Sequence, residues 1–301
     1  MRINLAWLYA ITKYGYPPPF DDILRAFRDA KRLGFEAVEL EAVGVRNLDE
    51  LCERKRMVSE ELDALGLRMV NFAGIFREVF AMDGTVRRRG MELFERSAAL
   101  AAELGSSTIQ TDSFTPPIRF RSDVPYEGTV SFGRTFAVEV DPTFSWDSFW
   151  ARLIGSLKQL ASIAEGHGLR FVIEPRVGET ISNSEGILRA LEAIGSPNFG
   201  VVLDCGHLHA QKELLPLSIE KLGGRIWYVH VSDNDGRDNY HLAPGRGTID
   251  WRGVFAGLNK HGYSGYFAVD VGGQEVSQRL DEEVLMTRKF LEENLAKYAF
   301  A

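Results

Sequence analysis

The sequence predicts an α/β fold, a single (β/α)8 barrel over residues 1–301, with an insertion after the fourth strand. Apolar runs of strand length alternate with longer segments of helical periodicity along all 301 residues, giving eight strand-then-helix pairs. Parallel strands joined by helices form either a closed barrel or an open doubly wound sheet, and the count of eight and the length favour the barrel. A dinucleotide-binding sheet is disfavoured because no Gly-x-Gly-x-x-Gly run follows the first strand.

The strands are the short apolar runs. In chain order they are expected at residues 3–8, 37–43, 68–73, 108–113, 170–174, 199–207, 225–232 and 265–271. Pro175 stops the fifth run, because proline cannot donate to a hydrogen-bonded ladder. The sixth run stays apolar until Asp204 and His207, two polar side chains that are unusual at the end of a buried strand.

The helices follow from apolar residues at spacings of three and four. They are expected at residues 21–33, 48–65, 85–104, 146–165, 184–194, 213–222, 251–260 and 276–297. In the first of them, Ile23 and Phe27 recur on one face. Gly34, Gly66 and Gly105 follow the first three helices directly, at the position where glycine commonly ends a helix.

Residues 115–145 interrupt this alternation. They carry four prolines and several aromatic residues, and a hairpin is predicted around residues 130–140. A connection of this length inside a compact domain is usually functional, so a lid or an interface is expected. A floppy insertion without such a role is the alternative.

Composition limits the class of partner and the compartment. The formal net charge is -7, whereas a nucleic-acid-binding protein normally shows a basic face, so no nucleic acid is expected. Cys52 and Cys205 fit no metal-ligand spacing and are predicted to be buried thiols in a reducing, cytoplasmic compartment. The apolar run Ile3–Ala10 lacks the features of a signal peptide, and no run reaches the ~18 apolar residues of a membrane span. A homo-oligomer is left open.

Four polar side chains stand at the ends of the last four predicted strands. Glu174, Asp204, His230 and Asp270 each lie about one strand-helix unit apart. Because functional residues of such barrels gather at the carboxyl ends of the strands, all four are expected to converge on one rim. Their neighbours along each strand are apolar and alternate with them, so the apolar residues face the helices when the four polar side chains point inward.

These ligand types predict a divalent metal ion. Three carboxylates and one imidazole form a hard, mostly oxygen site that suits Mn²⁺ best, with Mg²⁺, Co²⁺ and Zn²⁺ as alternatives. Without an ion, carboxylates so close together would repel one another. The alternative for each residue alone is a salt bridge at the rim or a satisfied histidine.

Further polar residues are expected on the same face as substrate contacts. His207 follows Asp204 in Asp-Cys-Gly-His, and Arg176 and Glu179 lie just beyond Glu174. Arg237 and His241 belong to the loop after the seventh strand. An arginine there suits a polyol, carboxylate or phosphate oxygen, although loop arginines are usually only solvated.

The chain resembles the sugar-phosphate isomerase/epimerase superfamily, the xylose-isomerase-like TIM barrels, over nearly its whole length. The resemblance is carried by Ile173-Glu-Pro, Leu203-Asp-Cys-Gly-His, His230-Val-Ser-Asp and the segment from His241 to Trp251. It implies that Glu174, Asp204 and His230 bind the metal, and that His207 and Arg237 contact the substrate. One departure is Asp270, since related epimerases and isomerases typically carry a glutamate at that place.

The resemblance implies an isomerase or epimerase that acts on a keto-sugar or keto-polyol. Glu174 would remove a proton next to the carbonyl, giving a metal-stabilised enediolate, and Asp270 would be the candidate for proton return on the opposite face. His207 would assist at a substrate oxygen. Loss of a β-substituent from the same intermediate would instead give a dehydratase or a deglycosylating lyase, for example on an inosose.

Two other classes of function are disfavoured or left to experiment. Apurinic endonucleases share the barrel, but their zinc cluster needs many histidines and this chain has six in all. A metal-free binding protein is the remaining alternative, and elemental analysis would reveal it.

Overall fold

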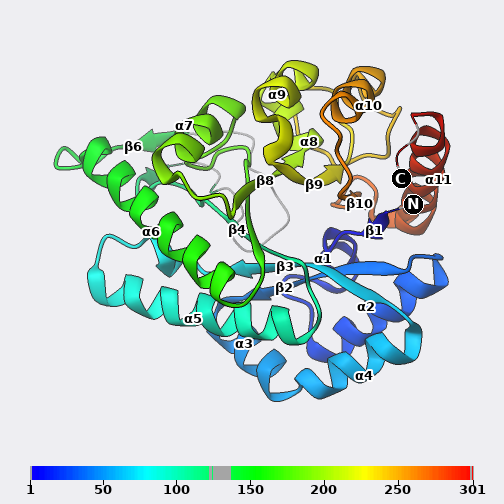
Figure 1. Ribbon diagram of the computed structural model, residues 1–301, viewed down its shortest axis with the longest axis horizontal. Helices are drawn as coiled ribbons and strands as arrows, with labels where there is room; N and C mark the ends of the chain where they lie inside the picture. The colour runs from blue at the N-terminus through cyan, green and yellow to red at the C-terminus, as the bar shows by residue number, and fades with distance from the viewer. Residues whose placement is uncertain (1, 122–123, 125–136, 299, 301) are drawn as a thin grey trace.

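In the computed structural model, eight parallel strands close into one barrel (Figure 1). The structure describes residues 2–121, 124, 137–298 and 300. The strands are β1 (Ile3–Leu5), β2 (Ala37–Val43), β3 (Arg68–Ile75), β4 (Thr108–Asp112), β7 (Arg170–Glu174), β8 (Phe199–Asp204), β9 (Ile226–Val231) and β10 (Tyr266–Val269). The barrel closes because β1 pairs in parallel with both β2 and β10. The predicted closed (β/α)8 barrel is therefore confirmed.

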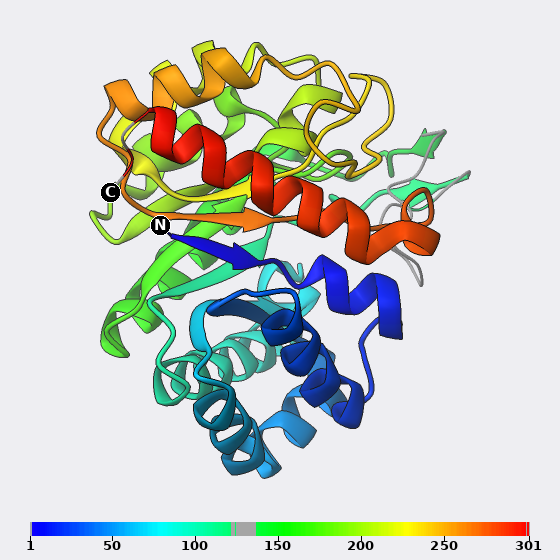
Figure 2. The same cartoon turned by 90° about the vertical axis from the view of Figure 1, so that its right-hand side faces the viewer.

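Helices surround the strands. They are α1 (Leu8–Tyr14), α2 (Phe20–Arg32), α3 (Gly44–Glu53), α4 (Lys55–Leu65), α5 (Gly84–Glu103), α6 (Trp146–Gly166), α7 (Ser184–Ile194), α8 (Cys205–Ala210), α9 (Leu215–Leu222), α10 (Trp251–Lys260) and α11 (Leu280–Lys297). Short 3-10 turns are η1 (Arg77–Phe80), η2 (Gly223–Arg225) and η3 (Ser277–Arg279). Figure 2 shows α11 alongside β10 and next to β1, where the two ends of the sheet meet.

Apolar side chains form two separate cores, as the alternation along the strands requires. The inner one fills the barrel and consists of Ala6, Ala37, Val70, Val172, Val202, Tyr228 and Ala268. The outer one lies between strands and helices, and it contains Phe171, Ile173 and Leu203. The predicted alternation of inward-facing and helix-facing residues is thus confirmed. Ile173 and Leu203 face the helices, whereas Glu174 and Asp204 point to the inner side of the barrel.

The first predicted strand, 3–8, is too long. β1 ends at Leu5, and the helix α1, which is not predicted from the sequence, begins at Leu8. In α1, the consecutive residues Leu8 to Ile11 are all buried, so their apolar run looks the same as that of a buried strand. The backbone leaves the sheet at Trp7, whose N–H donates to Glu39 Oε2 (3.0 Å).

Two further predicted elements differ in detail. The helix predicted at 48–65 is two helices, α3 and α4, separated by Arg54, which has φ -108° and ψ 15°. One residue outside the helical region hardly changes the apolar spacing, so periodicity does not reveal the break. The predicted strand 199–207 is also too long. β8 ends at Asp204, and the six-residue helix α8 begins at Cys205.

The segment 115–145 is described only in part. β5 (Arg119–Phe120) pairs with β6 (Val138–Glu139) in antiparallel fashion. The hairpin predicted around 130–140 lies mostly outside the described residues.

Cys205 is buried as predicted, whereas Cys52 is only half-buried, and both are free thiols. Within the described part of the chain, no helix is long and apolar enough to cross a membrane.

We expect Gly200→Ala to weaken the barrel below the site. A Cβ at Gly200, on the inner side of β8, would lie 2.4 Å from the Trp227 ring. Overpacking of this kind lowers the free energy of unfolding by about 1–3 kcal/mol, measurable by chemical denaturation. Gly224→Ala is the matched control, because a Cβ there meets no atom within 4 Å. Equal stability of the two variants would contradict the close approach of Trp227.

Candidate active site

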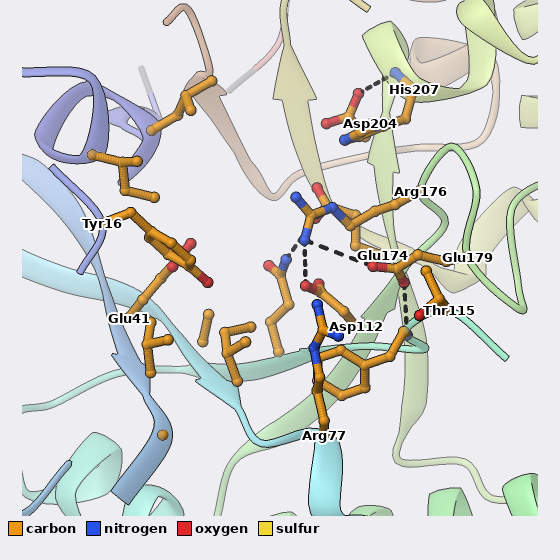
Figure 3. A pocket seen from close by; sticks show the side chains of 18 of the residues that line it. Tyr16, Glu41, Arg77, Asp112, Thr115, Glu174, Arg176, Glu179, Asp204 and His207 are labelled. Atoms are coloured by element: carbon orange, nitrogen blue, oxygen red, sulfur yellow. Dashed lines mark hydrogen bonds and ion pairs between the residues drawn. The ribbon is translucent and has the colours of Figure 1, made fainter. Parts of the chain in front are cut away.

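A cavity of about 540 Å³ opens at the carboxyl ends of the barrel strands (Figure 3). Side chains from β2, β3, β4, β7, β8 and β9 line it, together with residues of α1 and η1. The four predicted metal ligands, Glu174, Asp204, His230 and Asp270, all belong to its wall. They come from four consecutive strand ends, and the structure brings the four side chains to one cavity.

Three of these residues can share one ion. Glu174, Asp204 and His230 each offer a ligand atom within 4.8 Å of the others, and all three are buried. His230 Nδ1 lies 2.6 Å from Glu174 Oε1, 3.5 Å from Asp204 Oδ2 and 3.9 Å from Asp270 Oδ2. One imidazole nitrogen therefore faces three carboxylates, as a metal-ligand nitrogen would among oxygen ligands.

Glu39 sets the orientation of His230. Its Oε1 lies 3.0 Å from His230 Nε2, which leaves Nδ1 directed at the carboxylates. The other oxygen of Glu39 accepts the N–H of Trp7, so the carboxylate is held from both sides. A carboxylate behind a metal-binding histidine is a common arrangement, because it fixes the ring and makes its free nitrogen a better ligand.

The two oxygens of Asp204 have different surroundings. Oδ1 accepts the N–H of His207 (2.7 Å) and so caps α8. Oδ2 is buried without any hydrogen-bond partner. A buried carboxylate oxygen that lacks a donor is costly unless a cation satisfies it, so the donor set fits a divalent ion.

Asp270 belongs to a chain of polar contacts that continues away from His230. Its Oδ2 lies 2.9 Å from His241 Nδ1, and His241 Nε2 lies 2.9 Å from Asn239 Nδ2. Asn239 Nδ2 is also 2.9 Å from His207 Nδ1. His207 and His241 are both buried and both line the cavity. The structure therefore brings these two predicted substrate contacts together with Asp270.

Arg176 and Glu179 also lie at the cavity wall. Arg176 pairs with Asp112 and lies 3.6 Å from Glu174 Oε2 and 3.9 Å from Glu179 Oε1. One oxygen of Glu179 accepts the N–H groups of Ser113 and Phe114, each at 2.9 Å. Glu179 thereby fixes the loop after β4 and keeps its other oxygen near the guanidinium.

Arg237 is the one predicted site residue that the structure does not bring to the cavity. It is exposed, and its backbone N–H donates to Asp235 Oδ1 within a turn (2.8 Å). The surrounding loop is built around Asp233, which accepts hydrogen bonds from Gly245 N (2.8 Å) and Trp251 Nε1 (3.0 Å). A substrate contact through Arg237 stays a prediction.

The electrostatics of the site favour a cation. Although burial opposes charge, Glu39, Glu174 and Asp270 raise the pKa of His230 well above its usual range. Burial raises the pKa of Glu174 to about 7, against the opposing effect of His230. Burial, followed by the charge of Asp112, raises the pKa of both Glu41 and Glu179 to about 8. The carboxylates together create a negative potential that a positive ion would relieve.

Sequence reasoning missed the acidic residues that β2 and β4 contribute to the cavity. Glu39 and Glu41 of β2, and Asp112 of β4, all line the cavity. The signal was present, since Glu39 and Glu41 are two residues apart in a strand predicted with the correct bounds. In a strand, that spacing puts both carboxylates on one face, and Leu40 and Ala42 on the other belong to the outer core.

A family model described as xylose isomerase-like TIM barrel matches residues 27–291, so the chain belongs to that family. Fructoselysine 3-epimerase from Escherichia coli O157:H7 is 23% identical, over 90% of this chain and 91% of the relative. Inosose dehydratase from Bacillus licheniformis is 25% identical, over 68% and 78%. A solved structure of IOLI protein with a binding zinc atom shares the fold, with a TM-score of 0.74, 16% identity and 99% coverage of both chains.

We expect Glu39→Gln to lower metal affinity by about 10- to 100-fold, because the amide is a weaker acceptor for His230 Nε2–H. Isothermal titration with Mn²⁺ would measure this. Glu36→Gln is the matched control, since Glu36 is exposed and lies just before β2. Unchanged affinity in Glu39→Gln would contradict the orienting role of this carboxylate.

Proposed function

We propose that this protein is a divalent-metal-dependent epimerase or isomerase of an unphosphorylated keto-sugar or keto-polyol. The observation that carries the proposal is the convergence of Glu174, Asp204, His230 and Asp270 on one end of the cavity at the barrel mouth, where Asp204 Oδ2 lacks a donor. The named activities of sugar-epimerase relatives support the reaction class. Mn²⁺ is the favoured ion because carboxylate ligands predominate.

The four residues would hold the ion, which when bound would supply a Lewis acid beside the substrate carbonyl. Glu174 would take the proton from the neighbouring carbon, and Asp270 would hold a proton on the other side. Both carboxylates lie within 3.9 Å of the same nitrogen of His230, so they flank one position. His207 and His241, both buried at the wall, would orient substrate hydroxyl groups.

An unphosphorylated substrate is supported by the shortage of cations. Among the described residues that line the cavity, Arg77 and Arg176 are the two that carry a permanent positive charge. Arg176 already pairs with Asp112. A phosphate would normally require several positive or N–H donors directed at one point.

A dehydratase is the second candidate. Asp270 is shorter than the glutamate that the family resemblance leads one to expect, and His241 Nδ1 lies 2.9 Å from it. An imidazole beside the second carboxylate could act as the acid that a departing hydroxyl group requires. The match to an inosose dehydratase supports this alternative.

We expect the Mn²⁺-loaded protein to incorporate solvent deuterium next to the carbonyl of at least one substrate in a panel of ketohexoses and inososes. Glu174→Gln should lower that rate by about 10²–10⁴-fold, the usual contribution of a general base. NMR would record both the exchange and the product, so an epimer, an isomer and a dehydrated ketone are distinguished. Absence of exchange from the whole panel, with metal bound, would overturn the proposal.

We also expect Asp204→Asn to lose bound metal while the fold survives. An asparagine can still accept the His207 N–H through its carbonyl oxygen, so the cap of α8 is retained. The charge at Oδ2 disappears, and with it a ligand. Elemental analysis of the purified variant, beside Asp235→Asn in the exposed loop, would test this. Wild-type metal content in Asp204→Asn would exclude the assigned ligand set.

A further inference from the structure

The cavity has a second end, opposite the metal ligands. Tyr16 and Glu41 lie across the cavity from Asp204 and His207, with the Arg176 guanidinium between them and Asp112 below it (Figure 3). This wall comes from β2, β4 and the segment after α1, whereas the metal ligands come from β7 to β10. β4 is hydrogen-bonded to β7 with Asp112 in register with Glu174, so Asp112 lies where the β2–β4 wall meets the metal ligands, and Glu41 and Tyr16 lie farther from them.

Acidic side chains outnumber basic ones in the cavity as a whole. Eight residues with carboxylate side chains line the cavity, against two arginines and three histidines. A divalent ion would neutralise two of these negative charges at the metal end. Arg176 is shared among Asp112, Glu174 and Glu179, so it cannot compensate each of them fully.

Two carboxylates on the β2–β4 wall have oxygen atoms without a donor. Asp112 is 2% exposed, and its Oδ1 has no hydrogen-bond partner even though Oδ2 pairs with Arg176. Glu41 is half-buried, and no hydrogen bond or ion pair links it to any residue in the described part of the chain. A fully buried carboxylate oxygen without a donor, such as Asp112 Oδ1, is uncommon unless a ligand supplies the donor, and Glu41 is an acceptor accessible to the same ligand.

The cavity is also larger than one sugar. A volume of about 540 Å³ holds about 18 water molecules at about 30 Å³ each. A ketohexose has twelve non-hydrogen atoms and would leave part of the cavity unfilled. With the sugar against the metal ligands, the part of the cavity lined by Glu41, Tyr16, Leu8 and Ile11 would be left for a further group.

We propose that the substrate is a keto-sugar that carries an amine, and that Glu41 and Asp112 bind its ammonium group on the wall of the cavity formed by β2 and β4. An ammonium group supplies three donors and a positive charge, which match two acceptors in an acidic wall. The ring of Tyr16 adds a face against which a cation can pack. Because the sugar moiety is that of the proposed function, this proposal rests on that function.

The test compares two ligands of nearly equal size. They are D-fructose bearing a 3-aminopropyl ether and D-fructose bearing a 3-hydroxypropyl ether, each made at O1 and at O6, so that either end of the sugar can face Glu41. Isothermal titration with the Mn²⁺-loaded, full-length protein would give each dissociation constant. We expect the amine to bind at least about tenfold more tightly than the hydroxyl compound at one attachment point.

Variants assign that preference to the proposed residues. Glu41→Gln keeps the size of the side chain and removes its charge, so the preference for the amine should fall below about threefold. Glu36→Gln makes the same change of net charge on an exposed residue outside the cavity and should leave the preference intact. A preference that survives in Glu41→Gln would overturn the proposal, as would equal or weaker binding of the amine to the wild-type protein.

Binding and exchange separate this proposal from the proposed function. Preferential binding of the amine that depends on Glu41, without deuterium exchange in any ketose including the aminopropyl ethers, would contradict the proposed function and uphold the ammonium site. Deuterium exchange into D-fructose with no preference for the amine would uphold the proposed function and contradict the ammonium site. Tighter binding of the hydroxyl compound would show that a neutral group, such as a second sugar, occupies the space.

Discussion

The concentration of buried carboxylates around one imidazole is the constraint on which the site depends. Glu39, Glu174, Asp204 and Asp270 all approach His230, two of them within 3.0 Å. Such a group is stable only if positive charge and hydrogen bonds offset the repulsion. His230 supplies the charge when protonated, and a metal ion would replace that proton. The carboxylates at the centre of the barrel mouth therefore require positive charge, from a protonated His230 or from a metal ion.

The barrel divides this chemistry between its two sides. β7 to β10 end in the residues that would hold the ion, and β2 and β4 provide an acidic wall that begins directly beside β7. Gln110 of β4 joins the halves, because its amide donates to Glu174 Oε2 (3.1 Å) and accepts from Asn71 (2.8 Å). A closed sheet makes this possible, since strands far apart in sequence become opposite walls of one cavity.

Much of the fold and the metal end of the site could be predicted from the sequence. Strand ends such as Glu174 and Asp204 are recognisable because a single polar residue follows a buried apolar run, and alternation fixes the side on which it lies. Arg237 could not be placed in this way. Its loop is shaped by the hydrogen bonds of Asp233 to backbone and side-chain groups up to eighteen residues further on, which local patterns do not encode. The helix α1 was missed for a related reason, since full burial conceals the helical period.

Asp204 gives the site one more property. Its two oxygens serve two structures, the first turn of α8 and the proposed ion position. Because His207 belongs to that same short helix, the proposed ion and the helix that carries the proposed substrate contact share a side chain. Occupancy of the site is therefore thermodynamically linked to the order of α8. By mass action, a chain saturated with metal would melt at a higher temperature than one stripped of it, and the melting temperature itself would report how much of the protein is loaded.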